Sequence, residues 1–263
     1  MSFAISFVPD NTYNVVSQIN AVPFEVAPPW RPNSDTIVAS AYPNPVAAVN
    51  KGGSMLFPGT TFSYLSVPND ADFFFRTGQF TIEWFQYMTS QTSHPRVFTI
   101  GSYPSAIVGV SIEGAQFYFW VNGSSGINYT MTSYLNTWVH IAVTRDASNI
   151  IRIFQGGVVK LTTSANTSDF NNTTPTVVLA IGNETTGLSD SPFPGYITNF
   201  HLVKGTALYT GAFTPPTQPI TPVANTKLLL KATTSGTLLT DSSGLGKTVT
   251  NTGGITWDSR QPF

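Results

Sequence analysis

The alternation of side chains along residues 80–88, FTIEWFQYM, constrains the fold more than any other feature of the sequence. Successive side chains of a β-strand point to opposite faces. The alternation therefore divides these residues into two sets, with Phe80, Ile82 and Trp84 on one face and Thr81, Glu83, Phe85 and Tyr87 on the other. Because both faces carry aromatic side chains, we predict a strand inside a two-sheet sandwich, where the face away from the core is also covered or used.

Short strands separated by turn residues are predicted along most of the chain. Residues 97–100, 106–114 and 115–123 alternate in the same way, with a hairpin around Glu113 and Gly114. Residues 161–175 are rich in Ser, Thr and Asn and are predicted to form a surface loop. No segment has a convincing amphipathic helical stripe. The predicted core consists of Ile82, Trp84, Phe119, Ile141, Val143, Ile153, Leu179 and Ile197.

Composition excludes several classes of function. The chain has 263 residues, 41% of them hydrophobic and 13% aromatic, so a sizeable core can form. Lys and Arg number 12 and Asp and Glu 13, which gives a formal net charge of −1 and no electrostatic footprint for nucleic acid. The absence of cysteine excludes disulfides and thiolate chemistry. We expect no standard export signal, because residues 1–8 are apolar but lack a basic region and a small-residue cleavage site. We expect no membrane insertion, because no apolar run reaches about 18 residues.

Residues 1–50 are predicted to form an extended Pro-rich N-terminal arm. They contain seven prolines but no strand or helix periodicity. Aromatic residues such as Phe7, Trp30 and Tyr42 are spread through the segment, so it needs a surface to lie on. That surface is either its own domain or a neighbouring subunit of an oligomeric assembly.

Residues 51–263 are predicted to form one β-sandwich domain, with residues 226–263 completing its edge strands. About thirty residues at the C-terminus cannot bury a core of their own, although Leu228–Leu230 and residues 248–250 have strand patterns. We therefore expect them to pair with the same sandwich, close to residues 51–57. Pairing would also protect sheet edges from aggregation.

Two stretches resemble the concanavalin A-like lectin/glucanase superfamily in its laminin G-like form. The first is SMLFPGTTFSYLSVPNDADFFFRTGQFTIEWF, residues 54–85, and the second is the Trp-x-His-x-Ala-x-Thr-Arg-Asp run that begins at Trp138. Pro58 stands where many members of the family have Asp. The resemblance covers roughly residues 51–250 and implies an all-β, antiparallel two-sheet jelly roll. Because this superfamily contains lectins, hydrolases and structural modules, the fold leaves the activity open.

No catalytic residues are predicted. Hydrolysis of a glycosidic bond needs two carboxylates roughly 5 to 9.5 Å apart. None of the four glutamates, Glu25, Glu83, Glu113 and Glu184, has a second acid two or four residues away. The strand residue Glu83 is predicted to be partly solvated, and His140 and His201 to be satisfied or exposed strand residues. No nucleophile elbow accompanies a histidine.

Two candidate sites remain. Phe85, Tyr87, Tyr118 and Trp120 alternate away from the predicted core and could contact a sugar or a protein partner, unless the arm or the C-terminal strands cover them. Asn69, Asp70 and Asp72 form the best local group of oxygen ligands for calcium, whereas no histidine pair has the spacing of a zinc site. The alternative for this group is a capped turn.

The expected function is that of a non-enzymatic structural or binding module. The segment KGTALYTGAFTPPTQPITP resembles versions of this domain in tail and capsid proteins of viruses. This resemblance implies a virion component, with other virion or capsid proteins as partners and the virion as its location. The alternative is a carbohydrate-binding lectin that attaches to cell-surface glycans, outside the cell or on its surface.

Overall fold

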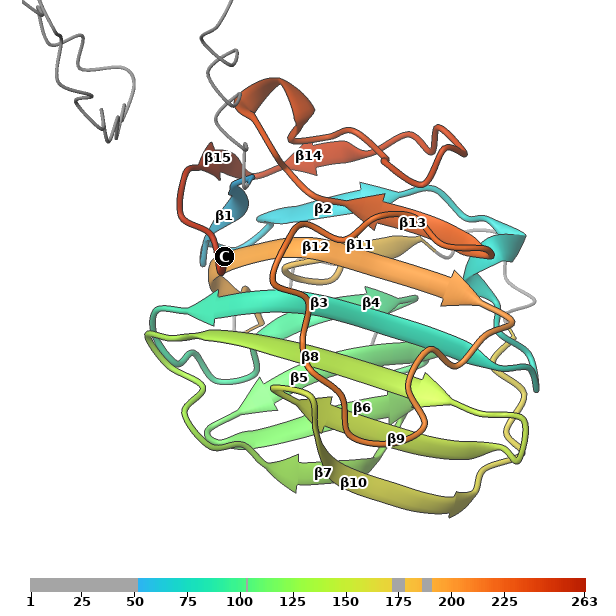
Figure 1. Ribbon diagram of the computed structural model, residues 1–263. Coiled ribbons are helices and arrows are strands. Elements are labelled where there is room, and N and C mark those ends of the chain that lie inside the picture. The colour runs from blue at the N-terminus through green and yellow to red at the C-terminus, as the bar shows by residue number, and fades with distance from the viewer. Residues whose placement is uncertain (1–51, 103, 172–177, 186–190) are drawn as a thin grey trace, which may run out of the picture. The chain divides into compact units, whose positions relative to one another are not determined.

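The computed structural model describes residues 52–102, 104–171, 178–185 and 191–263 (Figure 1). In these residues two antiparallel sheets pack against each other around one hydrophobic core. The predicted all-β, two-sheet jelly-roll sandwich is thus confirmed. Residues 1–50, the predicted arm, lie outside the described residues, so the division into arm and sandwich stays a prediction.

The first sheet has eight strands and contains the central pair β3 and β12. In spatial order its strands are β10 (Val158–Ala165), β9 (Ile150–Gln155), β8 (Trp138–Arg145), β3 (Phe80–Met88), β12 (Pro194–Lys204), β1 (Ser54–Pro58) and β15 (Thr256–Asp258), with β13 (Thr226–Leu230) also paired to β12. In its pairing with β3, the strand β12 has a bulge between Thr198 and His201, where Asn199 has a left-handed φ of 53°. On its other edge, β12 pairs with β1 before this bulge and with β13 after it.

The second sheet has seven strands and forms the other layer. Its order is β14 (Thr250–Thr252), β2 (Tyr64–Val67), β11 (Leu179–Ile181), β4 (Arg96–Ile100), β5 (Val108–Glu113), β6 (Gln116–Val121) and β7 (Ser124–Thr130). Two single 3₁₀ turns, η1 (Ala71–Phe73) and η2 (Ser235–Thr237), are the helical elements of the described residues. No helix in the described part of the chain is long and apolar enough to cross a membrane.

The core lies between the sheets and contains every residue predicted for it. In the pairing of β3 with β8, Ile82 lies opposite Val143 and Trp84 opposite Ile141, so one apolar face is continuous across the strands. All eight predicted residues, Ile82, Trp84, Phe119, Ile141, Val143, Ile153, Leu179 and Ile197, are fully buried. The predicted strand phase is therefore confirmed.

The loop prediction for residues 161–175 is wrong in its first part. The strand β10 continues through Ala165, and residues 172–177 lie outside the described ranges. The strand lies at the end of the first sheet, where one partner strand and an exposed face suffice, so Thr and Ser are tolerated. The sequence analysis also missed β7, which follows the tight turn at Asn122 and Gly123.

The C-terminal strands hydrogen-bond to strands near the start of the sandwich. In β15, Asp258 lies opposite Ser54 and Thr256 opposite Leu56, whereas β14 pairs with β2. The indole of Trp257 donates to the carbonyl oxygen of Ala232 at 2.8 Å, which joins the last strand to the segment after β13. Residues 226–258 therefore contribute strands to both sheets.

Residues 205–225, which we call the strap, connect β12 to β13 and cross the outer face of the first sheet (Figure 1). The hydroxyls of Thr81 and Thr144 donate to the strap carbonyls of Thr206 and Tyr209, at 3.0 and 2.9 Å. Farther along, the backbone N–H of Phe213 donates to the carbonyl of Gly157 at 2.9 Å. A Cβ at Gly157 would overlap the carbonyl oxygen of Phe213, so the strap requires glycine there.

Replacing Ile141 with alanine should lower the free energy of unfolding by about 2 to 5 kcal/mol, because it leaves a cavity at the centre of the core. Urea unfolding measures this loss. The control Thr162→Ala changes an exposed residue of β10 and should shift the free energy by about 0.5 kcal/mol or less. Equal effects of the two substitutions would contradict the predicted packing.

Ending the chain before residue 226 should give an insoluble or partly folded protein. The truncation removes β13, β14 and β15 and exposes the edges of β1, β2 and β12. Solubility and the thermal unfolding midpoint measure the effect. A soluble truncated chain that melts at the temperature of the full chain would show that these strands are not part of the folding unit.

Candidate functional site

A buried carboxylate lies on the outer face of the first sheet, under the strap. Glu83 on β3 is 1% exposed and accepts hydrogen bonds from three side chains. Nδ1 of His201 on β12 lies 2.8 Å from one carboxylate oxygen, and Nε2 of His140 on β8 lies 3.1 Å from the other. The hydroxyl of Tyr209 in the strap donates to that second oxygen at 2.9 Å. Side chains from β3, β8, β12 and the strap thus come together at the carboxylate of Glu83.

The hydrogen bonds assign the protons of the two histidines. Since Glu83 accepts, Nε2 of His140 carries a proton, and its buried Nδ1 has no hydrogen-bond partner among the described residues. His201 differs, because its Nε2 lies 2.8 Å from the hydroxyl of Thr226, which also accepts the N–H of Val223. Both nitrogens of His201 therefore have a partner, and the two histidines hold the Glu83 carboxylate from opposite neighbouring strands.

These contacts keep Glu83 ionised. Burial by itself would raise the pKa of Glu83, but the hydrogen bonds from His140 and His201 outweigh it and lower the pKa to about 2. Burial and the adjacent charge of Glu83 raise the pKa of Tyr209, so its hydroxyl remains a donor. The cluster is a charged anchor for the strap.

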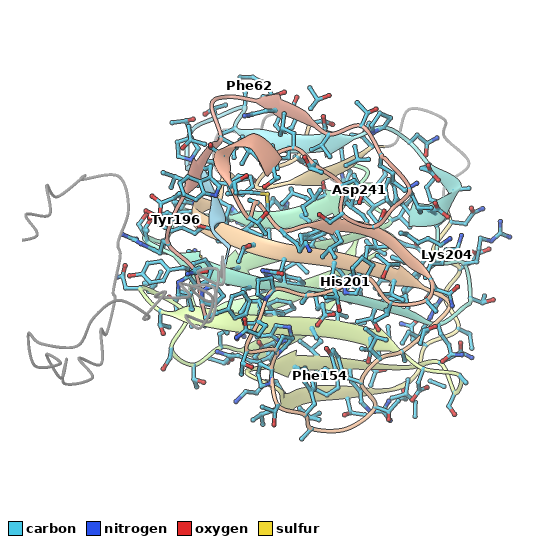
Figure 2. The ribbon with its side chains drawn as sticks, turned by 45° about the horizontal axis from the view of Figure 1, so that its top comes forward. Phe62, Phe154, Tyr196, His201, Lys204 and Asp241 are labelled. Atoms are coloured by element: carbon cyan, nitrogen blue, oxygen red, sulfur yellow. The ribbon has the colours of Figure 1, made fainter. Side chains whose placement is uncertain are left out.

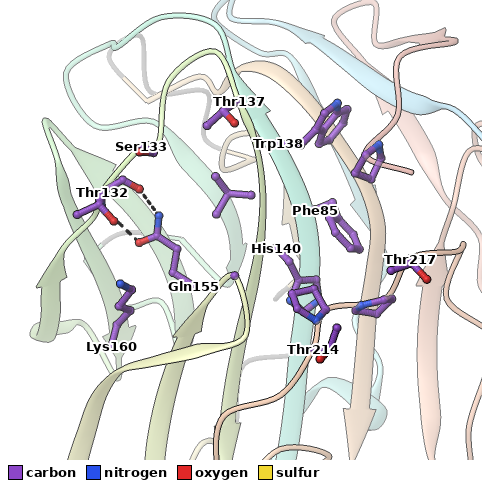
Figure 3. A pocket seen from close by; sticks show the side chains of 15 residues that line it. Phe85, Thr132, Ser133, Thr137, Trp138, His140, Gln155, Lys160, Thr214 and Thr217 are labelled. Carbon is purple, nitrogen blue, oxygen red and sulfur yellow. Dashed lines mark hydrogen bonds between the residues drawn. The ribbon is translucent and has the colours of Figure 1, made fainter.

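The strap separates two cavities on this face. The larger one, which we call the groove, has a volume of about 510 Å³ and lies over β3, β8 and β9 (Figure 3). The smaller one, of about 320 Å³, lies over Glu83 and His201. Pro216 and Thr217 of the strap line both cavities. Figure 2 labels His201 and Phe154 on the sheet that the strap crosses.

The groove combines one large aromatic wall with many uncharged polar groups. Trp138 is half-buried and lines one side, and Lys160 lies across from it (Figure 3). The remaining polar lining consists of Thr132, Ser133, Thr137, His140, Gln155, Thr214 and Thr217. The amide of Gln155 is held by the backbone of Thr132, which fixes its orientation. Among the described residues that line the groove there is no Asp or Glu.

An aromatic cluster supports the Trp138 wall. The ring of Tyr87 lies 5.7 Å from Trp138 and 5.8 Å from Tyr196, both edge to face. The guanidinium of Arg260 stacks on this cluster, 4.4 Å from the ring of Tyr196 and 5.2 Å from that of Tyr87. Trp138 is thereby held in place by its packing against Tyr87 and Tyr196.

The four predicted binding residues do not form one surface. Phe85 lines the groove but is buried against His140 and Phe263. Tyr87 does not line the groove and packs edge to face against Trp138. Tyr118 and Trp120 belong to β6 in the second sheet. There the indole of Trp120 donates to Ser111 at 2.8 Å, and the guanidinium of Arg96 lies over its ring.

The sequence analysis did not select Trp138, which lines the groove, and it assigned Glu83 the wrong environment. Glu83 is buried rather than partly solvated, and it joins His140 and His201, which were considered separately. The available signal was the alternation itself, which places all three on outward-facing positions of their strands. Only the strand order shows that these positions are neighbours.

The candidate calcium ligands are paired with lysines. The ammonium of Lys247 lies 2.7 Å from Asp70 and 2.9 Å from Asp72, and that of Lys227 lies 3.2 Å from Asp72. Burial opposes these contacts, but the two lysines still lower the pKa of Asp72. Asp70 also caps the turn that follows Asn69. Calcium here remains a prediction, and it would have to displace the Lys247 ammonium. No group of three or more metal-ligating side chains is present in the described residues.

Stability should fall in acid as Glu83 becomes protonated. A lowered pKa in the folded state contributes stability above the unfolded pKa, near 4.5, and this contribution is lost as the pH falls to about 2. The difference corresponds to roughly 3 kcal/mol. Glu83→Gln should be less stable than the wild type at pH 6, and the gap should narrow toward pH 2.5.

Urea unfolding of both proteins between pH 6 and 2.5 measures this gap. Glu113→Gln, the same substitution at the end of β5, is the control and should show no such convergence. A gap that stays constant with pH would mean that the charge of Glu83 does not stabilise the fold.

Comparison with known proteins places this arrangement in a family. The model of the concanavalin A-like lectin/glucanases superfamily matches residues 59–208, which is more than half of the chain. No curated protein sequence gives a significant match.

Solved structures share the fold at low sequence identity. A candidate carbohydrate binding protein from Bacteroides ovatus is 18% identical, with a TM-score of 0.55, over 79% of this chain and 60% of that one. The chain therefore spans less than two thirds of that protein. A heptameric pentraxin from Limulus polyphemus is 12% identical, with a TM-score of 0.51, over 82% of this chain and 99% of that one. The protein belongs to the concanavalin A-like lectin/glucanase superfamily.

Proposed function

We propose that the protein is a non-enzymatic carbohydrate-binding module whose ligand lies in the groove. The observation that carries this proposal is the combination of the Trp138 wall with a lining of hydroxyl and amide groups. A sugar ring presents a C–H face that packs on an aromatic ring and hydroxyls at its edge that need hydrogen-bond partners. The groove offers both on a rigid sheet.

The carboxylates support binding without hydrolysis. Glycosidases place two carboxyl groups on either side of the scissile bond. In the part of the chain that the structure describes, no Asp or Glu lines the groove, and the nearby Glu83 already accepts hydrogen bonds from His140, His201 and Tyr209. The function that fits is recognition.

The more specific expectation, a virion component that contacts other capsid proteins, remains a prediction. It depends on the resemblance in residues 195–222 and on the arm, residues 1–50, and the similar proteins reported above lend it no support. Location in the virion or at the cell surface is equally a prediction. A glycan-binding module is compatible with either location.

The test is glycan binding by the full chain, first on a glycan array and then by titration calorimetry. Trp138→Ala should weaken binding by at least about tenfold, because it removes the aromatic wall. The matched control is Trp120→Ala, which removes an indole from the second sheet and should leave binding unchanged.

Circular dichroism and thermal unfolding establish that both variants are folded. Binding that survives Trp138→Ala but is lost in Trp120→Ala would move the site to the second sheet, where Tyr118 and Trp120 were predicted to act. No binding to any glycan would overturn the proposal.

A further inference from the structure

Among the described residues, the groove is lined by one lysine and by no arginine, aspartate or glutamate. Lys160 is exposed and lines the groove, and in the described part of the chain no acidic side chain pairs with its ammonium. The buried carboxylate of Glu83 is ionised, but it is enclosed by its donors His140, His201 and Tyr209. A ligand in the groove therefore meets the exposed ammonium of Lys160, and no Asp or Glu among the described lining residues competes for it.

A second cation, Arg260, lies on the aromatic cluster that packs against Trp138. Arg260 is exposed and lies on the rings of Tyr87 and Tyr196, which pack against Trp138. It is two residues from Pro262, which lines the groove. Asp258 accepts the backbone N–H of Arg260 at 2.7 Å, but no carboxylate in the described residues pairs with its guanidinium. Ring stacking uses the face of a guanidinium and leaves its N–H edge available for an oxyanion.

From this placement we infer that the groove selects an acidic glycan, in which a carboxylate or a sulfate is bound by Arg260 or Lys160. The inference rests on the proposed function and specifies its ligand class. The guanidinium suits an acid with two oxygens in one plane, and the ammonium acts as a point charge. The chain has a net charge of only −1 and few charged residues, so its whole surface does not attract anions. The selectivity for an acidic glycan therefore comes from these two local cations.

The experiment compares acidic glycans with neutral versions of the same chains. An array should carry uronate-containing and sulfated oligosaccharides beside their carboxyl-reduced and desulfated counterparts, and its strongest signals should come from acidic members. Loss of the acid should weaken binding about tenfold or more, as expected for a charge-assisted hydrogen bond. Which of the two treatments abolishes binding distinguishes carboxylate from sulfate.

Variants assign the charge to its residue. Lys160→Gln and Arg260→Gln should each weaken binding of the acidic glycan several-fold, leave the neutral counterpart unaffected, and reduce the salt dependence of binding. Arg260→Lys, which keeps the charge but loses the planar fork, should fall between the wild type and Arg260→Gln. Lys231→Gln is the control, since Lys231 neither lines the groove nor stacks on the aromatic cluster beside Trp138.

The outcomes separate the two proposals. Equal binding of acidic and neutral glycans, lost in Trp138→Ala, would overturn this inference and leave the proposed function standing. Failure to bind any glycan would overturn both. Binding of a single-stranded oligonucleotide as tightly as the acidic glycan would show a general polyanion site and would also overturn the inference.

Discussion

The ionised side chain of Glu83 is the constraint on which the outer face of the first sheet depends. A charge with 1% exposure is tolerated only if donors surround it, and they come from β8, β12 and the strap. These donors are far apart in the sequence, so the network forms only when the strands are in register. It thereby couples the pairing of the central strands to the path of residues 205–225.

The same network positions several of the residues that line the groove. Once the strap is tied to Glu83, Pro216 and Thr217 form a wall over the sheet, and His140 is fixed in the groove lining by its contact with Glu83. On the other side, Tyr87, Tyr196 and Arg260 hold the Trp138 wall. The groove is therefore preorganised by the scaffold, which lowers the entropy lost when a ligand binds.

The sequence predicted the inside of the sandwich better than its outside. A period of two determines which residues face the core, so Ile82, Ile141 and Val143 were placed correctly from local pattern alone. Sites on the outer face depend on strand order, which local pattern does not contain. Phe85 and Trp120 therefore seemed equivalent, although they belong to different sheets. The strap was unpredictable in its path, because proline-rich segments have no period to follow.

The contact between Gly157 and Phe213 bears on how such a module can diverge. The strap lies against the β9–β10 turn only because residue 157 has no side chain. Most groove residues that would meet a ligand, including Thr132, Ser133, Thr137 and Lys160, take no part in the Glu83 network. Substitutions at these rim positions can change ligand preference without disturbing the fold, whereas a single change at Gly157 would lift the strap and alter the depth of the groove. In the proposed carbohydrate-binding module, mutations at the rim would thus change ligand specificity, and a mutation at Gly157 would change the shape of the groove. These are two independent routes by which such a module can acquire a new ligand.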